Sequence, residues 1–133
     1  MGRYGNRSAV RHLLNATFAA AHHFGMRLPE LFCGFAKNAG EPPVWYPVAC
    51  LPQAWSSGAL FMLLQAALGI EIDAYANEIR IDSPQLPSEV DQLEVRGLQG
   101  ADRRVTLRFQ RVDDRVMASA THASRGLRVL VDV

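Results

Sequence analysis

The chain has 133 residues, of which 49% are hydrophobic and 20% are charged. This composition is typical of one globular domain and excludes a disordered segment. The formal net charge is +1, and the basic residues are spread singly along the chain instead of forming a stripe. We therefore expect no nucleic-acid partner and no electrostatic attraction to an anionic membrane.

The apolar stretches are too short and too interrupted to predict a membrane span. The most apolar run covers residues 54–68 and contains Ser56, Ser57 and Gln65, whereas a spanning helix needs about 20 apolar residues. The N-terminal stretch lacks the charged-then-apolar pattern of a signal peptide. We expect a cytoplasmic protein that does not contact a membrane.

Two cysteines, Cys33 and Cys50, are the chain's only ones. In a reducing compartment they are expected as free thiols, and a disulfide between them is the alternative. Together with His22 and His23 they lack zinc-ligand spacing. The sequence also has no Gly-rich phosphate loop, nucleophile elbow or HExxH motif. We expect no metal and no other cofactor.

The first half of the chain predicts two helices, one on each side of a long loop. Residues 6–24 repeat apolar side chains every three or four positions, with Asn6 or Ser8 as a possible cap and Gly25 after the end. Residues 26–51 are rich in Gly and Pro and predict a long loop, which its four aromatic residues mark as ordered. A second helix is expected from Pro52 to Leu68, ending at Gly69. It is apolar on nearly every side.

After Gly69 the apolar period changes from helical to the alternation of strands. Alternating residues over 79–81, 93–95, 105–109, 116–120 and 127–131 predict about five antiparallel strands with one buried face. Turns are expected at residues 100–102, 113–114 and 124–126. The prediction is an α+β fold. A helical hairpin in residues 1–69 packs on the apolar face of a strand-rich region in residues 70–133, and the two parts form one compact unit.

Glu30 is the candidate for acid–base chemistry. It lies in the long loop among Pro29, Leu31, Phe32 and Phe35, and a carboxylate held among apolar side chains can act as a general acid or base. The alternative is a glutamate that serves only as a cap or an ion-pair partner. His22 and His23 are predicted to occupy the last turn of the first helix, where their charge suits the helix dipole.

Gln53 and Trp55 are candidates for binding a sugar. An aromatic ring stacks on the axial hydrogens of a pyranose, and a nearby amide bonds its hydroxyls. The alternative for Trp55 is a tryptophan of the hydrophobic core.

Five blocks, in order, resemble the C-terminal run of the catalytic region in bacterial amylo-alpha-1,6-glucosidases, which are glycogen-debranching-type enzymes. They are residues 3–5 (RYG), 28–35 (LPELFCGF), 46–50 (YPVAC), 52–56 (PQAWS) and 63–66 (LLQA). The resemblance implies that the helices are the end of an (alpha/alpha)6 toroid. It also implies that Glu30 is the counterpart of the general base and that Gln53 and Trp55 line the sugar pocket.

The chain departs from this family by lacking the upstream sequence that carries the general acid and most of the toroid. Inverting hydrolysis needs an acid and a base on opposite sides of the bond. Glu41, Glu71 and Asp73 are nearby acids in the sequence, but none matches the family's acid motif. The expected function is therefore that of a C-terminal fragment of an alpha-1,6-acting glucosidase, inactive alone.

Two other functions remain open from the sequence. One is a non-catalytic carbohydrate-binding or oligomerisation module, and the other is a small unrelated enzyme that uses Glu30 with His22 or His23. The apolar second helix predicts a homo-oligomer built on residues 52–68, with Leu60 and Leu64 in the interface. Alternatively, a partner protein that supplies the rest of the toroid covers this helix. The expected ligand is an alpha-glucan oligosaccharide.

Overall fold

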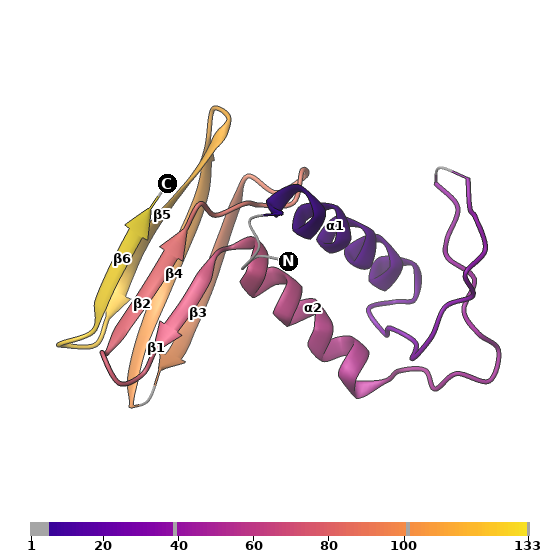
Figure 1. Cartoon of the computed structure of the whole chain (residues 1–133), viewed down its shortest axis with the longest axis horizontal. Helices are drawn as coiled ribbons and strands as arrows, with labels where there is room; N and C mark the ends of the chain where they lie inside the picture. The colour runs from indigo at the N-terminus through magenta and orange to yellow at the C-terminus, as the bar shows by residue number, and fades with distance from the viewer. Residues whose placement is uncertain (1–5, 39, 101, 133) are drawn as a thin grey trace.

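The computed structural model describes residues 6–38, 40–100 and 102–132. Within them lie two helices and six strands: α1 (Arg7–His23), α2 (Ala54–Ala67), β1 (Ile70–Asp73), β2 (Glu78–Asp82), β3 (Gln92–Gly100), β4 (Arg103–Val112), β5 (Arg115–Ala123) and β6 (Arg128–Asp132). Figure 1 shows the strands at one end of the molecule, the two helices side by side in the middle, and the long loop at the other end. The predicted α+β fold is confirmed.

Helix α1 follows the sequence prediction closely. The Asn6 side chain accepts a hydrogen bond from the Ala9 N–H at 3.1 Å, so Asn6, and not Ser8, is the cap. Val10 and Leu14 are buried on the expected stripe, whereas Leu13 is 40% exposed. Gly25 has a positive φ of 60°, as a residue that ends a helix often does.

Helix α2 begins at Ala54, two residues later than expected. Gln53 is still extended, with φ −113° and ψ 131°, so Pro52 lies outside the helix. At the other end Gly69 has a φ of 65°, and a Cβ there would come within 2.0 Å of the Asp82 carbonyl oxygen. Gly69 is therefore required both by the turn out of the helix and by the close approach of β2.

The two helices pack on each other, and Leu64 near the end of α2 links their cluster to the apolar core of the sheets. Val10, Leu14 and Ala67 form the centre of the helical cluster, and Leu60 and Leu64 pack against it. Leu64 also packs against the core of the sheets. The hairpin was expected to lie across the apolar face of the sheet; instead its apolar contact with the sheets is local. Leu60 and Leu64, which the sequence places in an interface between copies, are partly buried against the helical cluster.

The strands form two three-stranded sheets, in the orders β1–β2–β6 and β3–β4–β5. Their facing side chains build the main core, from Ile79 and Ile81 on one sheet to Val105, Leu107 and Phe109 on the other. Strand β6 runs parallel to β2. The prediction of five antiparallel strands was therefore wrong in number and in one pairing. The short β1 was missed because three of its four residues are exposed, and alternation does not encode strand direction.

The loop of residues 26–51, which we call the arm, is folded back on itself. The N–H of Cys33 donates to the carbonyl of Val44 at 2.7 Å, and that of Tyr46 donates to Leu31 at 3.1 Å. Phe32 and Trp45 form an isolated bridge between the two sides. The prediction of an ordered loop is confirmed for its described residues, since backbone hydrogen bonds connect its two sides.

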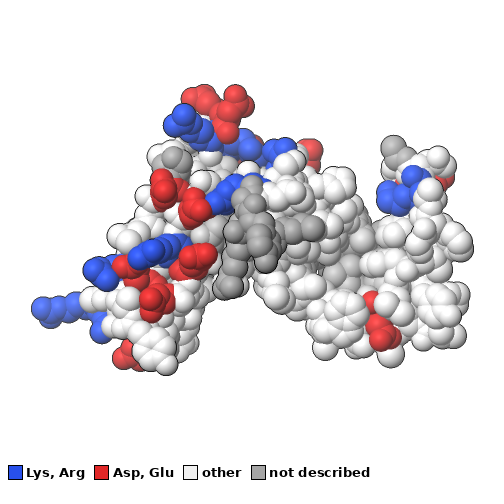
Figure 2. All heavy atoms as spheres, in the orientation of Figure 1, with Lys and Arg blue, Asp and Glu red and all other residues white. Residues whose placement is uncertain are grey.

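The charged side chains are divided unevenly between the two halves. No Asp, Glu, Lys or Arg occurs between Glu41 and Glu71. Figure 2 shows the consequence on one face: red and blue side chains gather over the strands, whereas few are seen over the helices and the arm. The apolar character of this half is therefore a property of its surface as well as of its core.

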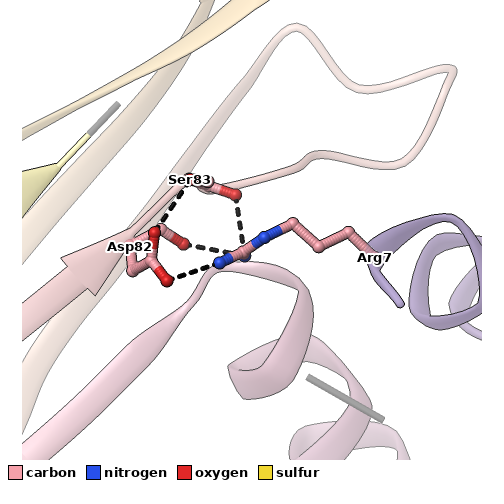
Figure 3. A network of polar contacts seen from close by, with 3 residues as sticks. All are labelled: Arg7, Asp82 and Ser83. Atoms are coloured by element: carbon pink, nitrogen blue, oxygen red, sulfur yellow. Dashed lines mark hydrogen bonds and ion pairs between the residues drawn. The ribbon is translucent and has the colours of Figure 1, made fainter. Parts of the chain in front are cut away.

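One arginine joins the start of α1 to the end of β2. Arg7 forms an ion pair with the Asp82 carboxylate at 2.5 Å and donates to the carbonyls of Asp82 and Ser83 at 2.9 and 3.1 Å. The Ser83 hydroxyl donates to the other oxygen of the same carboxylate at 2.8 Å (Figure 3). Because the Arg7 side chain is only 26% exposed, this network fixes the helical pair against the sheets.

Candidate functional site

Glu30 lies where the arm meets the helices, half-buried and next to the buried Pro29. Its N–H donates to the Cys50 carbonyl at 2.9 Å, and its carboxylate accepts the Cys50 N–H at 3.4 Å. Both bonds connect the outgoing side of the arm to the returning side. The carboxylate is thus oriented by backbone, with hydrogen-bonding capacity left for another donor.

Gln53 lies at the same junction. Its N–H donates to the Leu28 carbonyl at 3.0 Å, so residues 28–30 run alongside residues 50–53. The Gln53 side-chain oxygen accepts the Ala54 N–H at 3.2 Å at the start of α2. The structure therefore brings the segments that carry Glu30 and Gln53 side by side through these backbone bonds, although the two residues are 23 positions apart in the sequence.

Trp55 is in the first turn of α2, two residues beyond Gln53. It is 58% exposed, so in this chain it is not a core tryptophan. An indole that is open to solvent can stack on a sugar ring.

A small aromatic cluster near this junction was missed by the sequence analysis. The Phe24 ring lies 5.8 Å from that of Phe32 and 5.9 Å from that of Trp45. It joins the end of α1 to both sides of the arm, and each pair contributes about 0.5–1.5 kcal/mol beyond area burial. The aromatic residues of the arm could have indicated such a cluster from the sequence. Their contact with Phe24, however, depends on how the arm folds back.

The other acids considered from the sequence have different roles. At the arm tip, the Asn38 side-chain amide and N–H donate to the Glu41 carboxylate at 3.0 and 3.1 Å. These bonds lower the pKa of Glu41, whereas a general acid needs a raised one. Asp73 accepts the N–H groups of Tyr75 and Ala76 in the turn after β1, and Glu71 is exposed in β1.

The histidines at the end of α1 take part in helix termination and packing. The His23 ring packs edge-on against Phe24 at 4.8 Å. His22, His23 and Glu30 all lie in the described part of the chain, and no ion pair within 4 Å joins them. The geometry gives no support to a catalytic Glu–His pair.

Large apolar side chains remain uncovered over the arm and α2. Phe35, Val48, Phe61 and Met62 are 74%, 81%, 73% and 72% exposed. We call these four residues, together with Trp55, the uncovered apolar surface. Isolated exposed apolar residues are normal, but several large ones on a segment without charged residues, such as residues 42–70, are typical of an interface.

Cys33 and Cys50 are free thiols in the structure. Among residues 6–38, 40–100 and 102–132, no group of three or more His, Cys, Asp and Glu side chains could hold a metal ion. Neither of the helices described is long and apolar enough to cross a membrane.

Comparisons of the chain with family models, curated proteins and solved structures find no match. The chemistry of the site therefore rests on its residues. One oriented carboxylate, an amide and an exposed indole at one junction can position water and a sugar hydroxyl. Inverting hydrolysis also requires a second carboxyl group about 6.5–9.5 Å away, and no carboxyl group considered above fits that role.

Proposed function

We propose that the chain is the C-terminal portion of a debranching-type alpha-glucosidase that acts on alpha-1,6-linked glucans and is inactive alone. The observation that carries the proposal is the junction of residues 28–30 with residues 50–53, in which the Glu30 carboxylate accepts the Cys50 N–H and the Gln53 N–H donates to the Leu28 carbonyl. These residues belong to three of the five blocks on which the sequence resemblance to amylo-alpha-1,6-glucosidases depends. The α1–α2 hairpin is then the last helical pair of an (alpha/alpha)6 toroid.

In this proposal Glu30 is the general base. Its carboxylate, oriented by the Cys50 N–H, takes a proton from the water that attacks the anomeric carbon. Trp55 stacks on the sugar ring, and Gln53 hydrogen-bonds a hydroxyl. The general acid comes from polypeptide outside these 133 residues, and that polypeptide covers the uncovered apolar surface. The expected location, with two free thiols, is the cytoplasm.

Complementation tests the proposal. The chain is co-expressed with a bacterial amylo-alpha-1,6-glucosidase from which the segment corresponding to residues 3–100 has been deleted, and glucose release from panose is measured. We expect activity with the wild-type chain and not with either part alone. Glu30→Gln should abolish it. Glu41→Gln is the matched control, because it changes the same side chain at the tip of the same arm, and it should leave activity intact.

Each outcome has a definite meaning. Restored activity that survives Glu30→Gln would show that Glu30 is not the base. Failure of the two parts to co-purify and to restore activity would reject the toroid origin. Glucose release by the chain alone, abolished by Glu30→Gln, would make the chain a complete enzyme and overturn the proposal of inactivity.

A non-catalytic carbohydrate-binding or oligomerisation module is the second candidate. The exposure of Phe61 and Met62 on α2 favours it, since a second copy of the chain could bury both. Saturable quenching of tryptophan fluorescence by a maltooligosaccharide, with the chain alone, would support the carbohydrate-binding form. It should be lost in Trp55→Leu and kept in Trp45→Leu.

A further inference from the structure

A cavity of about 400 Å³ lies where the start of α1 meets the strands. It is bounded by the start of α1, the segment that follows β2 and the β4–β5 hairpin, through Arg11, residues 83–86, Arg111 and residues 114–116. Cavities of this size accommodate a small organic molecule. Figure 2 shows basic side chains gathered along the upper edge of the molecule, with acidic ones beside them.

The three arginines of this cavity differ in what they already bind. Arg111 already binds other residues of the chain. Its guanidinium donates to the carbonyls of Pro87 and Val90 at 2.9 and 3.2 Å and lies 3.6 Å from the Asp91 carboxylate. It therefore stabilises the connection before β3. Arg11 and Arg115 are exposed, and neither forms an ion pair or side-chain hydrogen bond with any other residue that the structure describes.

From this arrangement we propose that the cavity binds a small molecule through an oxyanion held by Arg11 and Arg115. Arginine presents a planar set of donors that matches phosphate or carboxylate geometry. The two guanidiniums come from segments about a hundred positions apart in the sequence, so the site exists only in the folded chain. The walls also include the apolar Leu86 and Val116, which suit the carbon part of such a ligand.

The charges of the cavity favour a small anion over a nucleic acid. The lining contains three arginines and one carboxylate, that of Asp114, so its net charge is modest. A nucleic acid needs an extended basic surface, whereas the remaining basic residues of this chain are scattered and its net charge is +1. Asp114 repels an anion, and its removal should strengthen binding.

Binding is measured by ¹H–¹⁵N NMR of the whole chain, titrated with sodium phosphate and, separately, with sodium acetate, each against sodium chloride at equal ionic strength. We expect saturable shifts confined to the N–H groups of residues 11, 83, 85, 86, 111 and 114–116 and of their immediate neighbours. The stronger of the two titrants identifies the oxyanion. Arg11→Gln and Arg115→Gln should each weaken binding tenfold or more, and Asp114→Asn should tighten it several-fold.

Arg27→Gln is the matched control, because it removes one exposed arginine far from the cavity. It should bind like the wild-type chain. The urea midpoint of each variant establishes that it remains folded. Absence of saturable shifts with both titrants would overturn the proposal, as would equal weakening in the Arg27→Gln variant. Identical shifts with chloride would show a general ion effect and would also refute it.

Discussion

Replacing Phe61 tests whether α2 forms an interface between copies of the chain. Phe61 and Met62 are 73% and 72% exposed, whereas Leu60 and Leu64 pack against α1. A substitution at either leucine would disturb the hairpin itself and could not report on assembly alone. Phe61→Gln removes an exposed ring and retains a residue that favours helix, so it should leave the monomer folded.

The expected size of the effect follows from the exposed area. Full burial of a Phe or Met side chain contributes about 1.5–3 kcal/mol. Because Phe61 is 73% exposed in the single chain, burial of its exposed part in an interface would contribute about 1–2 kcal/mol. A twofold interface contains each residue twice. Phe61→Gln should therefore cost about 2–4 kcal/mol, which weakens the dimer on the order of 30- to 1000-fold in Kd.

Sedimentation velocity over a range of micromolar concentrations measures the change. The control is Tyr75→Gln, since Tyr75 is 101% exposed but lies in the turn between β1 and β2. It should leave the Kd unchanged. The free energy of unfolding should change by less than about 0.5 kcal/mol in both variants, as is usual at exposed positions. A wild-type chain that sediments only as a 14.7 kDa monomer, or a dimer equally stable after Phe61→Gln, would refute the reasoning.

Three further predictions concern stability and titration. Gly69→Ala should lower the free energy of unfolding in urea by about 2 kcal/mol or more, because the new Cβ collides with the β2 backbone in a left-handed conformation; an unchanged value would show that β2 moves freely. Arg7→Gln should cost about 1–2 kcal/mol, and the exposed Arg96→Gln much less, in the same urea experiment. Asn38→Ala should raise the pKa of Glu41 toward its usual value, since its side-chain hydrogen bond favours the charged form. Carboxyl ¹³C shifts measure this change, and an unaltered pKa would mean that this bond is absent in solution.

The sequence determined the elements that follow from one local property, such as helical periodicity, a capping side chain or alternation of apolar residues. Helical periodicity and the Asn6 cap define α1, and the loss of that periodicity at Gly69 marks the change to strands. Alternation located most of the strands, because one face of each sheet is buried. The position of Glu30 in an ordered loop could also be inferred, from its aromatic neighbours.

The arrangement of these elements was decided by contacts between distant residues. Nothing in the alternation of β6 specifies that it pairs parallel with β2, since direction depends on the path of the chain between two sheets. The junction of Glu30 with Gln53 depends on the arm folding back through backbone hydrogen bonds that any residue can make. For the same reason the sequence did not reveal the cavity between Arg11 and Arg115, whose segments meet only after α1 is fixed to β2. Side-chain pattern thus located the helices and most of the strands. The tertiary structure alone decided which residues are neighbours and which apolar side chains, such as Phe61 and Met62, remain exposed.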